Sequence, residues 1–461
     1  YEISACLVGS EMCIRDSLTR ENRNFRDMSN TSPSQQALSE KAPTHLRPFI
    51  FMVILMALIG FITSLNQQFQ APLKETFLAE SGALKNAFAT FITFSFFLSY
   101  LLMGPVSARY LQRCGYKKTL LKGIVVVAFS LVIFELSALS FQWIGEGSLN
   151  HITIGSIQLP LGYFLFLIGS FVSGTGLTYL QSSVNPYVVI CNVPHTTGVT
   201  RQNIAGTGNS LMTTLVPLFV GLVIFGGKEG SELEVSAIFL PMAILILFVG
   251  LLYFGVRTTS LPELPNTTEA KGEHLEHSVF SFRHLTLGVI GIFMYVGCEV
   301  CVGSNIVLYA QQDLGISYEM AVKWASLYWF SMLVGRFFSS FLSMIKAHVQ
   351  LAVSTFCAGL LVVLAILLKM PWLLIGVGLF HSLMWGAIFS LSLEGLGKYT
   401  ARATGVLLMG VVGGAILPFT QGLLADLFHS WTWTWLLIIA GEVYMLYYAL
   451  WGYKPKQVKR A

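Results

Sequence analysis

The stretch VIGIFMYVGCEVCVGSNIVLYA, residues 289–310, decides the fold because it is long and apolar enough to cross a membrane. A helix of about 20 apolar residues spans the hydrocarbon core of a bilayer. One carboxylate, Glu299, lies near its middle. An acid at that depth costs at least about 2.5 kcal/mol, so it faces a cavity or a partner. We interpret Glu299 as part of an ion or solute pathway; the alternative is an acid retained for packing between helices.

The composition extends this interpretation to the whole chain. Of the 461 residues, 54% are hydrophobic and only 11% are charged, whereas soluble domains carry about 25% charged residues. The chain is therefore predicted to be an all-α, multi-pass membrane protein. Its net charge of +5 is small and does not indicate a nucleic-acid partner. The sequence contains no nucleophile–base set, phosphate loop or metal motif, so we expect neither an enzyme nor a bound metal or cofactor beyond a coupling cation.

Twelve stretches have the length and hydropathy of membrane-spanning helices. They are residues 49–70, 84–106, 118–141, 159–189, 201–226, 235–256, 284–310, 319–343, 349–368, 371–396, 402–424 and 431–453. The longest hydrophilic break, residues 257–283, separates six spans from six. We therefore expect an N-terminal six-helix bundle at 49–256, a linker at 257–283 and a C-terminal six-helix bundle at 284–453.

Positive charge predicts the orientation of the chain in the membrane. Lysine and arginine gather in the loop after the second span, in the linker and in the tail 454–461. Such loops stay in the cytoplasm, so both termini and the linker are expected to be cytoplasmic, in the plasma (inner) membrane. Residues 28–48 are a polar tail. Residues 1–27 lack the apolar core of a signal peptide and resemble a spurious leader from translated transcript assemblies, so we hypothesise that the native chain begins at Met28.

Four motifs carry a resemblance to a known family. They are GFITSLN (60–66), GLTYLQSSVNPYV (176–188), MYVGCEVCVGS (294–304) and GLFHSLMWGAIFSLSLEGLGKYT (378–400). These runs resemble the fucose/glucose–galactose permease family, which are sugar–cation symporters of the major facilitator superfamily. The resemblance covers about residues 49–450. It implies twelve helices in two bundles, with the solute bound between them at mid-membrane.

Polar side chains within the spans are the candidate sugar contacts. A site that hydrogen-bonds hydroxyl groups discriminates strongly against solutes that lack them. The candidates are Asn66, Gln67, Gln181, Asn185, Asn209, Asn305, His381, Trp385 and Gln421. Three have alternatives: Asn185 can satisfy carbonyls freed by a kink at Pro186, Trp385 can pack rather than stack on a sugar ring, and His381 can relay protons.

Two acids are the candidates for cation coupling. Glu299 is the first, and Glu135 in the third span is the second, with snorkelling to the interface as its alternative. The resemblance places Gln67 where the family usually has an aspartate, and Gly206 where it has a glutamine. Gating or structural roles are assigned to Arg113, Lys117, Pro186, Arg336 and Glu394.

These features lead to three functional hypotheses. The first is a secondary active transporter, working as a monomer, for a hexose such as glucose or galactose, or a 6-deoxyhexose such as fucose, coupled to H⁺ or Na⁺. The second is an uncoupled sugar facilitator, motivated by the amides at Gln67 and Gln181. The third is a membrane sugar sensor that binds without transport.

Overall fold

The computed structural model describes residues 45–78, 84–144, 151–154, 157–194, 196, 198–228, 239–261, 278–339, 345–396 and 399–455. The expected leader 1–27, most of the tail 28–48, linker residues 262–277 and tail residues 456–461 lie outside these ranges. The larger of two compact units comprises Arg47–Cys191 and Thr196–Ala461. Every contact discussed below lies within that unit.

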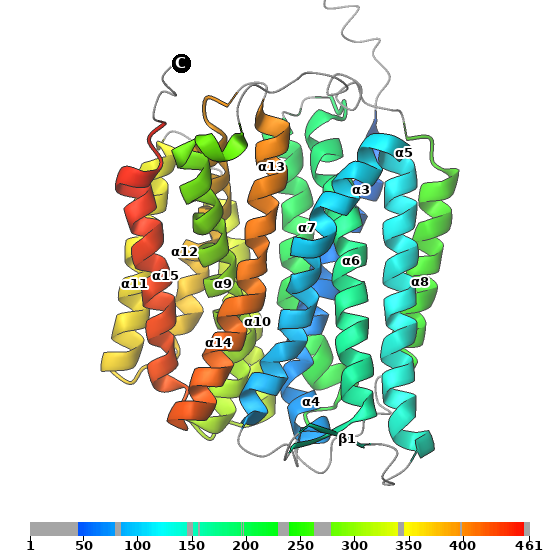
Figure 1. Cartoon of the computed structure of the whole chain (residues 1–461), viewed down its shortest axis with the longest axis vertical. Coiled ribbons are helices and arrows are strands. Elements are labelled where there is room, and N and C mark those ends of the chain that lie inside the picture. Colours follow the sequence, from blue (N-terminus) through cyan, green and yellow to red (C-terminus); the bar gives the residue numbers. More distant parts are fainter. Residues whose placement is uncertain are drawn as a thin grey trace, which may run out of the picture. The chain divides into compact units, whose positions relative to one another are not determined.

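Helices make up almost all of this unit. In the first half they are α3 (Leu46–Gln68), α4 (Gln70–Phe77), α5 (Lys85–Ile144), α6 (Leu161–Ile190), α7 (Gly198–Leu218), the π-helical turn η3 (Phe219–Ile224) and α8 (Phe239–Thr258). In the second half they are η7 (Val279–Ser281), α9 (Arg283–Gln312), α10 (Tyr318–Ser339), α11 (Ala347–Leu367), α12 (Leu373–Leu393), α13 (Thr400–Met409), η10 (Gly410–Val412), α14 (Gly413–Phe428), η11 (Thr432–Trp435), α15 (Leu436–Tyr447) and η12 (Tyr448–Gly452). The helices run alongside one another (Figure 1), and the halves meet where α7 contacts α10 and α5 contacts α14.

The helix α5 contains two predicted spans joined by a sharp turn. Its backbone leaves the helical region at Gly115, where φ is 78° and ψ is 175°. Side chains disfavour a positive φ, whereas glycine adopts it freely. The turn lies close to the boundary between the apolar segments Lys85–Leu111 and Arg113–Ser140, within the predicted loop between the second and third spans.

The all-α membrane fold predicted from the sequence is confirmed. Eleven helices among the described residues are long and apolar enough to cross a membrane. The predicted eighth span is present as α10, which is of similar length but carries Glu319, Lys323 and Arg336. One element was not predicted: β1 (His151–Ile154) pairs antiparallel with β2 (Ile157–Pro160), and β2 runs from the expected loop 142–158 into the first two residues of the predicted fourth span.

The helix α9 is packed tightly by its neighbours. A Cβ atom at Gly297 would lie 2.1 Å from Leu417 of α14, and one at Gly303 would lie 2.2 Å from Trp329 of α10. Small residues allow helices in a membrane to approach this closely. The two glycines that flank Glu299 therefore accommodate neighbouring helices, and this packing fixes the position of the acid.

Candidate functional site

Glu299 lies in a cluster of ionisable groups from three helices. Its side chain is half-buried on α9. The groups that act on it electrostatically are the guanidinium of Arg336, the hydroxyl of Tyr295 and the imidazole of His381. Arg336 belongs to α10 and His381 to α12. The second half of the chain thus places a carboxylate, a guanidinium, a phenol and an imidazole close together.

Arg336 connects this cluster to the first half of the chain. Its Nη1 donates to Ser210 Oγ at 2.5 Å and to the Gly206 carbonyl at 3.3 Å, both on α7. A Cβ atom at Gly206 would lie 4.0 Å from the same nitrogen, so the glycine leaves the guanidinium room to approach. Arg336 was expected in an interhelical charge network, and its contacts here join α10 to α7.

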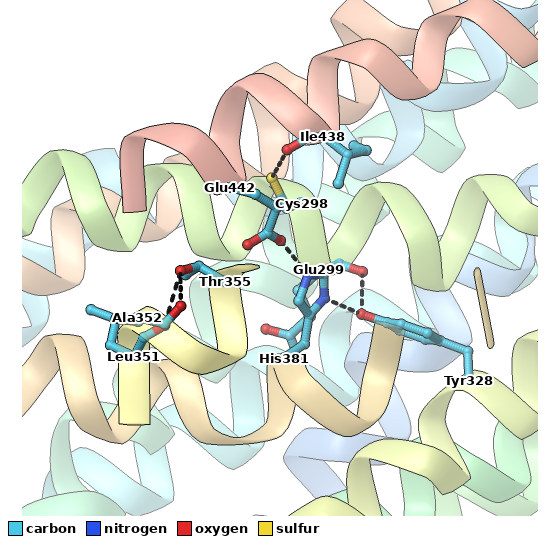
Figure 2. Close-up of polar contacts among 9 residues, drawn as sticks. All are labelled: Cys298, Glu299, Tyr328, Leu351, Ala352, Thr355, His381, Ile438 and Glu442. Atoms are coloured by element: carbon cyan, nitrogen blue, oxygen red, sulfur yellow. Dashed lines mark hydrogen bonds and ion pairs between the residues drawn. The ribbon is translucent and has the colours of Figure 1, made fainter. Parts of the chain in front are cut away.

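A second acid, Glu442 of α15, lies in the same region. Its Oε1 is 2.8 Å from His381 Nε2, and both side chains are almost completely buried, at 2% and 0% exposed. The other ring nitrogen, His381 Nδ1, is 2.8 Å from the hydroxyl of Tyr328. That hydroxyl also lies 3.3 Å from the backbone carbonyl of Glu299. Figure 2 shows the resulting chain of contacts from Glu442 to α9.

Sequence reasoning missed Glu442, although the rule that identified Glu299 applies to it equally. Glu442 is the one charged residue in LLIIAGEVYMLY, the sequence of α15, and an acid in such a segment is expensive. His381 was a candidate sugar contact. In this structure both of its ring nitrogens contact protein partners, Tyr328 and Glu442.

Three of the candidate amides have an oxygen that no protein group satisfies. Asn66 Oδ1, Gln67 Oε1 and Asn305 Oδ1 are buried without a hydrogen-bond partner among the described residues. Buried polar atoms are nearly always paired in folded proteins. The helices that carry them, α3 and α9, meet where Gln68 Nε2 donates to the Gly303 carbonyl at 3.2 Å. These oxygens are therefore available to a ligand that donates hydrogen bonds.

The nitrogens of the candidate amides are held by the protein. Asn66 Nδ2 donates to Ser170 Oγ at 2.7 Å, and Asn305 Nδ2 donates to Gln421 Oε1 at 2.9 Å. Gln421 Nε2 in turn donates to Thr434 Oγ1 at 3.2 Å. These bonds orient the amide groups, which is what a selective hydrogen-bonding site requires.

Four further candidates lie on α6, α7 and α12. Gln181 Nε2 donates to the Tyr100 hydroxyl at 3.2 Å, and Asn209 Nδ2 donates to the Met56 carbonyl at 3.1 Å. Asn185 is half-buried on α6. The ring of Trp385 lies 6.2 Å from that of Tyr295, and therefore beside the Glu299 cluster.

The remaining predicted residues lie elsewhere. Glu135 is half-buried on α5 between Val132 and Leu136, which are 40% and 45% exposed, so it faces outward with apolar neighbours. Pro186 lies inside α6, which continues to Ile190.

The candidate gating residues occupy the ends of helices. Arg113 is exposed, and Lys117 Nζ donates to the Thr259 carbonyl at 3.0 Å, which ties the turn in α5 to the end of α8. Glu394 is exposed at the end of α12, where its carbonyl lies 3.0 Å from His284 Nε2. Lys398, the expected neighbour of Glu394, lies outside the described residues.

Comparisons with known proteins agree with the resemblance in the sequence. The sequence profile of the Major Facilitator Superfamily matches residues 56–411. The chain is 31% identical over 411 residues to a glucose/galactose transporter of Brucella abortus, covering 87% of this chain and 93% of the relative. It is 31% identical over 429 residues to a putative glucose/galactose transporter of Helicobacter pylori, covering 88% and 97%. The fold resembles the crystal structure of the fucose:proton symporter of E. coli, with a TM-score of 0.64 at 20% identity over 88% of this chain and 98% of that one.

Proposed function

This chain belongs to the Major Facilitator Superfamily, and from that premise we propose that it carries a monosaccharide across the membrane by alternating access. It is thus a multi-pass membrane protein of a transporter family and not an enzyme. In such folds the solute binds at mid-membrane between the two halves. Its similarity to glucose/galactose transporters favours a hexose such as glucose or galactose, and its similarity to a fucose:proton symporter makes a 6-deoxyhexose such as fucose the alternative.

The observation that carries this proposal is the set of unpaired amide oxygens on α3 and α9. A sugar hydroxyl can donate to Asn66 Oδ1, Gln67 Oε1 or Asn305 Oδ1, each of which is buried without a protein partner among the described residues. Gln181, Asn185 and Asn209 offer further amides, whereas Gln421 supports the site by holding Asn305, because protein groups engage both its oxygen and its nitrogen. Trp385 adds an aromatic face for the apolar side of a sugar ring. His381 is left out of the sugar contacts because protein groups engage both its nitrogens.

We assign cation coupling to Glu299 through its relation to Arg336. The guanidinium acts on Glu299 in the second half and donates to Ser210 and Gly206 in the first half. When H⁺ or Na⁺ neutralises the Glu299 carboxylate, the attraction between Arg336 and Glu299 weakens. The hydrogen bonds from Arg336 to α7 then change in strength. A ligand shifts a conformational equilibrium by its differential affinity for the two states. Cation binding at Glu299 would therefore bias which side of the transporter opens.

The experiment that tests this proposal compares Glu299→Gln with wild type in proteoliposomes. We expect the variant to exchange labelled D-glucose or D-galactose in counterflow, because counterflow needs no coupling. We expect it to lose accumulation against a gradient, because glutamine cannot take up a proton and binds Na⁺ weakly. A sugar panel with pH and Na⁺ varied separately identifies the substrate and the cation. Full gradient-driven uptake in Glu299→Gln would remove this residue from coupling.

Glu135→Gln provides the matched comparison. It removes the same charge from another span, but Glu135 lies between exposed apolar residues on α5. We therefore expect accumulation to persist in this variant. If accumulation is lost in Glu135→Gln and kept in Glu299→Gln, Glu135 on α5 is the coupling acid and Glu299 is not.

An uncoupled facilitator is the second candidate function. It is favoured by Gln67, where the resembled family usually has an aspartate, and by Gln181, where only its fucose branch has an acid, so the proposed pathway has fewer titratable groups. Alkalinisation of the medium on addition of sugar to expressing cells would exclude a facilitator.

For either function we propose a monomer in the plasma membrane with both termini cytoplasmic, because the loops richest in lysine and arginine share one side.

A further inference from the structure

The buried pair of His381 and Glu442 has no role in the transport cycle proposed above. Glu442 Oε1 is 2.8 Å from His381 Nε2, whereas Glu442 Oε2 has no hydrogen-bond partner among the described residues. A buried carboxylate is strongly destabilising unless its charge is compensated. The pair is neutral overall only when it holds two protons, whether the proton between the imidazole and the carboxylate rests on nitrogen or on oxygen.

The hydroxyl of Tyr328 reports the protonation state of this pair. It has a single proton and two neighbours, His381 Nδ1 at 2.8 Å and the Glu299 carbonyl at 3.3 Å. If Nδ1 carries a proton, it donates to the Tyr328 oxygen, and the Tyr328 proton can be donated to the Glu299 carbonyl. If Nδ1 is bare, it accepts the Tyr328 proton, and the Glu299 carbonyl loses this donor.

Counting protons shows which state has a proton on Nδ1. The loaded pair holds two protons, one on Nδ1 and one between Nε2 and Oε1. Loss of one proton to water leaves the other between Nε2 and Oε1, because two bare acceptors 2.8 Å apart would repel each other. The remaining proton therefore cannot occupy Nδ1. Only the loaded pair completes the hydrogen-bond chain from Glu442 to the backbone at Glu299.

The groups around the pair come from every helix packed against it. Three groups of α9 face the pair: Tyr295, Cys298 and Glu299. The Tyr295 ring is 6.2 Å from the His381 ring, Cys298 interacts electrostatically with Glu442, and Glu299 interacts electrostatically with His381. From α10 come Tyr328 and, beyond Glu299, Arg336. On α11 the nearest position is Gly359, where an added Cβ atom would lie 3.4 Å from the Cβ of Glu442.

We propose that His381 and Glu442 form a second proton-binding site, which acts on Glu299 through Tyr328. Its ligand is a proton, gained and lost at Nδ1 of His381. Tyr328 is a positioning residue, because its hydroxyl holds the α9 backbone at Glu299 only while the pair is loaded. This inference rests on the proposed function, since its consequence is a pH-dependent geometry at the coupling acid.

The first test measures the pH dependence of sugar exchange in proteoliposomes with equal pH on both sides. One hydrogen bond of about 1 kcal/mol corresponds to a rate change of about fivefold, and the scan runs from acidic to alkaline pH because proton loss from the neutral loaded pair leaves a buried negative charge. We expect such a change in D-glucose or D-galactose counterflow by wild type over this range. In the Glu299→Gln background, where the coupling acid adds no titration of its own, we expect Tyr328→Phe to exchange sugar with a flat pH profile, because phenylalanine cannot respond to Nδ1.

The matched control is Tyr448→Phe. Tyr448 is also a buried tyrosine, and its hydroxyl also reaches an α9 carbonyl, that of His284 at 3.2 Å. It contacts Ser392 and not the His381–Glu442 pair. We expect Tyr448→Phe to keep the wild-type pH profile. A wild-type profile in Tyr328→Phe, or profiles flattened equally in both variants, would overturn the proposal.

The second test observes the proton directly and does not depend on transport. Nitrogen NMR of histidine-labelled protein, with the His381 signal identified by its absence in His381→Gln, should show Nδ1 changing from protonated to bare as pH rises. The change should be altered in Glu442→Gln. A His381 ring that keeps one protonation state throughout would overturn the site. If wild type exchanges no sugar at any pH while His381 titrates, the proposed function fails and the proton site stands.

Discussion

At the scale of single residues, Gln67 differs most from the other amides of the site. It is 2% exposed, and its Oε1 has no hydrogen-bond partner among the described residues. The resembled family usually has an aspartate at this position. An amide can still accept a sugar hydroxyl, but it cannot gain or lose a proton. Under the proposed function, an amide here keeps the binding role and lacks a titratable group, which leaves Glu299 as the proposed coupling acid.

We predict that Gln67→Leu weakens sugar binding without weakening the fold. Leucine has a similar volume, and the lost oxygen has no protein partner among the described residues. Loss of one hydrogen bond to sugar should raise the KM for counterflow about three- to tenfold. Ser130→Ala is the control, because the Ser130 hydroxyl donates to the Val127 carbonyl of its own helix. An unchanged KM in Gln67→Leu would place the sugar elsewhere.

At the scale of elements, α9 is positioned by glycines on the partner helix. A Cβ atom at Gly413 would lie 1.8 Å from the backbone oxygen of Phe293, closer than any real contact. The Cβ of an alanine there would meet rigid backbone, so α9 and α14 would have to separate. Such a shift would move Glu299, because it lies less than two turns beyond Phe293 on α9.

We predict opposite effects for alanine at two glycines of one span. Gly413→Ala should destabilise the protein by about 1–3 kcal/mol, as overpacking does. Gly405→Ala should be neutral or stabilising by up to about 1 kcal/mol, because alanine favours helix over glycine and, among the described residues, no atom outside its own stretch of helix lies within 4 Å of a Cβ placed there. Thermal unfolding of the purified proteins measures both. Equal melting temperatures in the two variants would contradict the packing described for α9.

At the scale of the whole unit, one carboxylate joins the two halves at the start of α5. Asp426 of α14 accepts from the backbone nitrogens of Asn86 at 3.1 Å and Ala87 at 2.7 Å. A negative charge at a helix N-terminus is stabilising, and these residues lie in the first turn of α5. Gln312 of α9 adds a bond from its Nε2 to Asn86 Oδ1 at 2.9 Å. These bonds therefore join the two halves at this end of the unit.

We predict that Asp426→Asn opens this end more often. Charge-assisted hydrogen bonds contribute about 1.5–3 kcal/mol, so the open population should rise about tenfold or more. Distances between spin labels at Lys85 and Phe428 measure it. Asp313→Asn is the control: Asp313 Oδ2 accepts from Ser430, Trp431 and Thr432, all in the second half. It should lower stability without changing the label distances. Unchanged distances in Asp426→Asn would show that this contact does not close the pathway.

The sequence by itself determined the all-α membrane fold and singled out Glu299. Bilayer thickness sets helix length, and an acid within an apolar segment is costly wherever that segment packs; Glu442 satisfied the same rule and was overlooked. The tertiary structure alone decided the partners: Arg336 between Glu299 and α7, His381 with Glu442, and Glu135 facing outward. Lipid is as apolar as a helix interface. Apolar residues therefore surround each span, and their pattern does not reveal which face of a helix meets another.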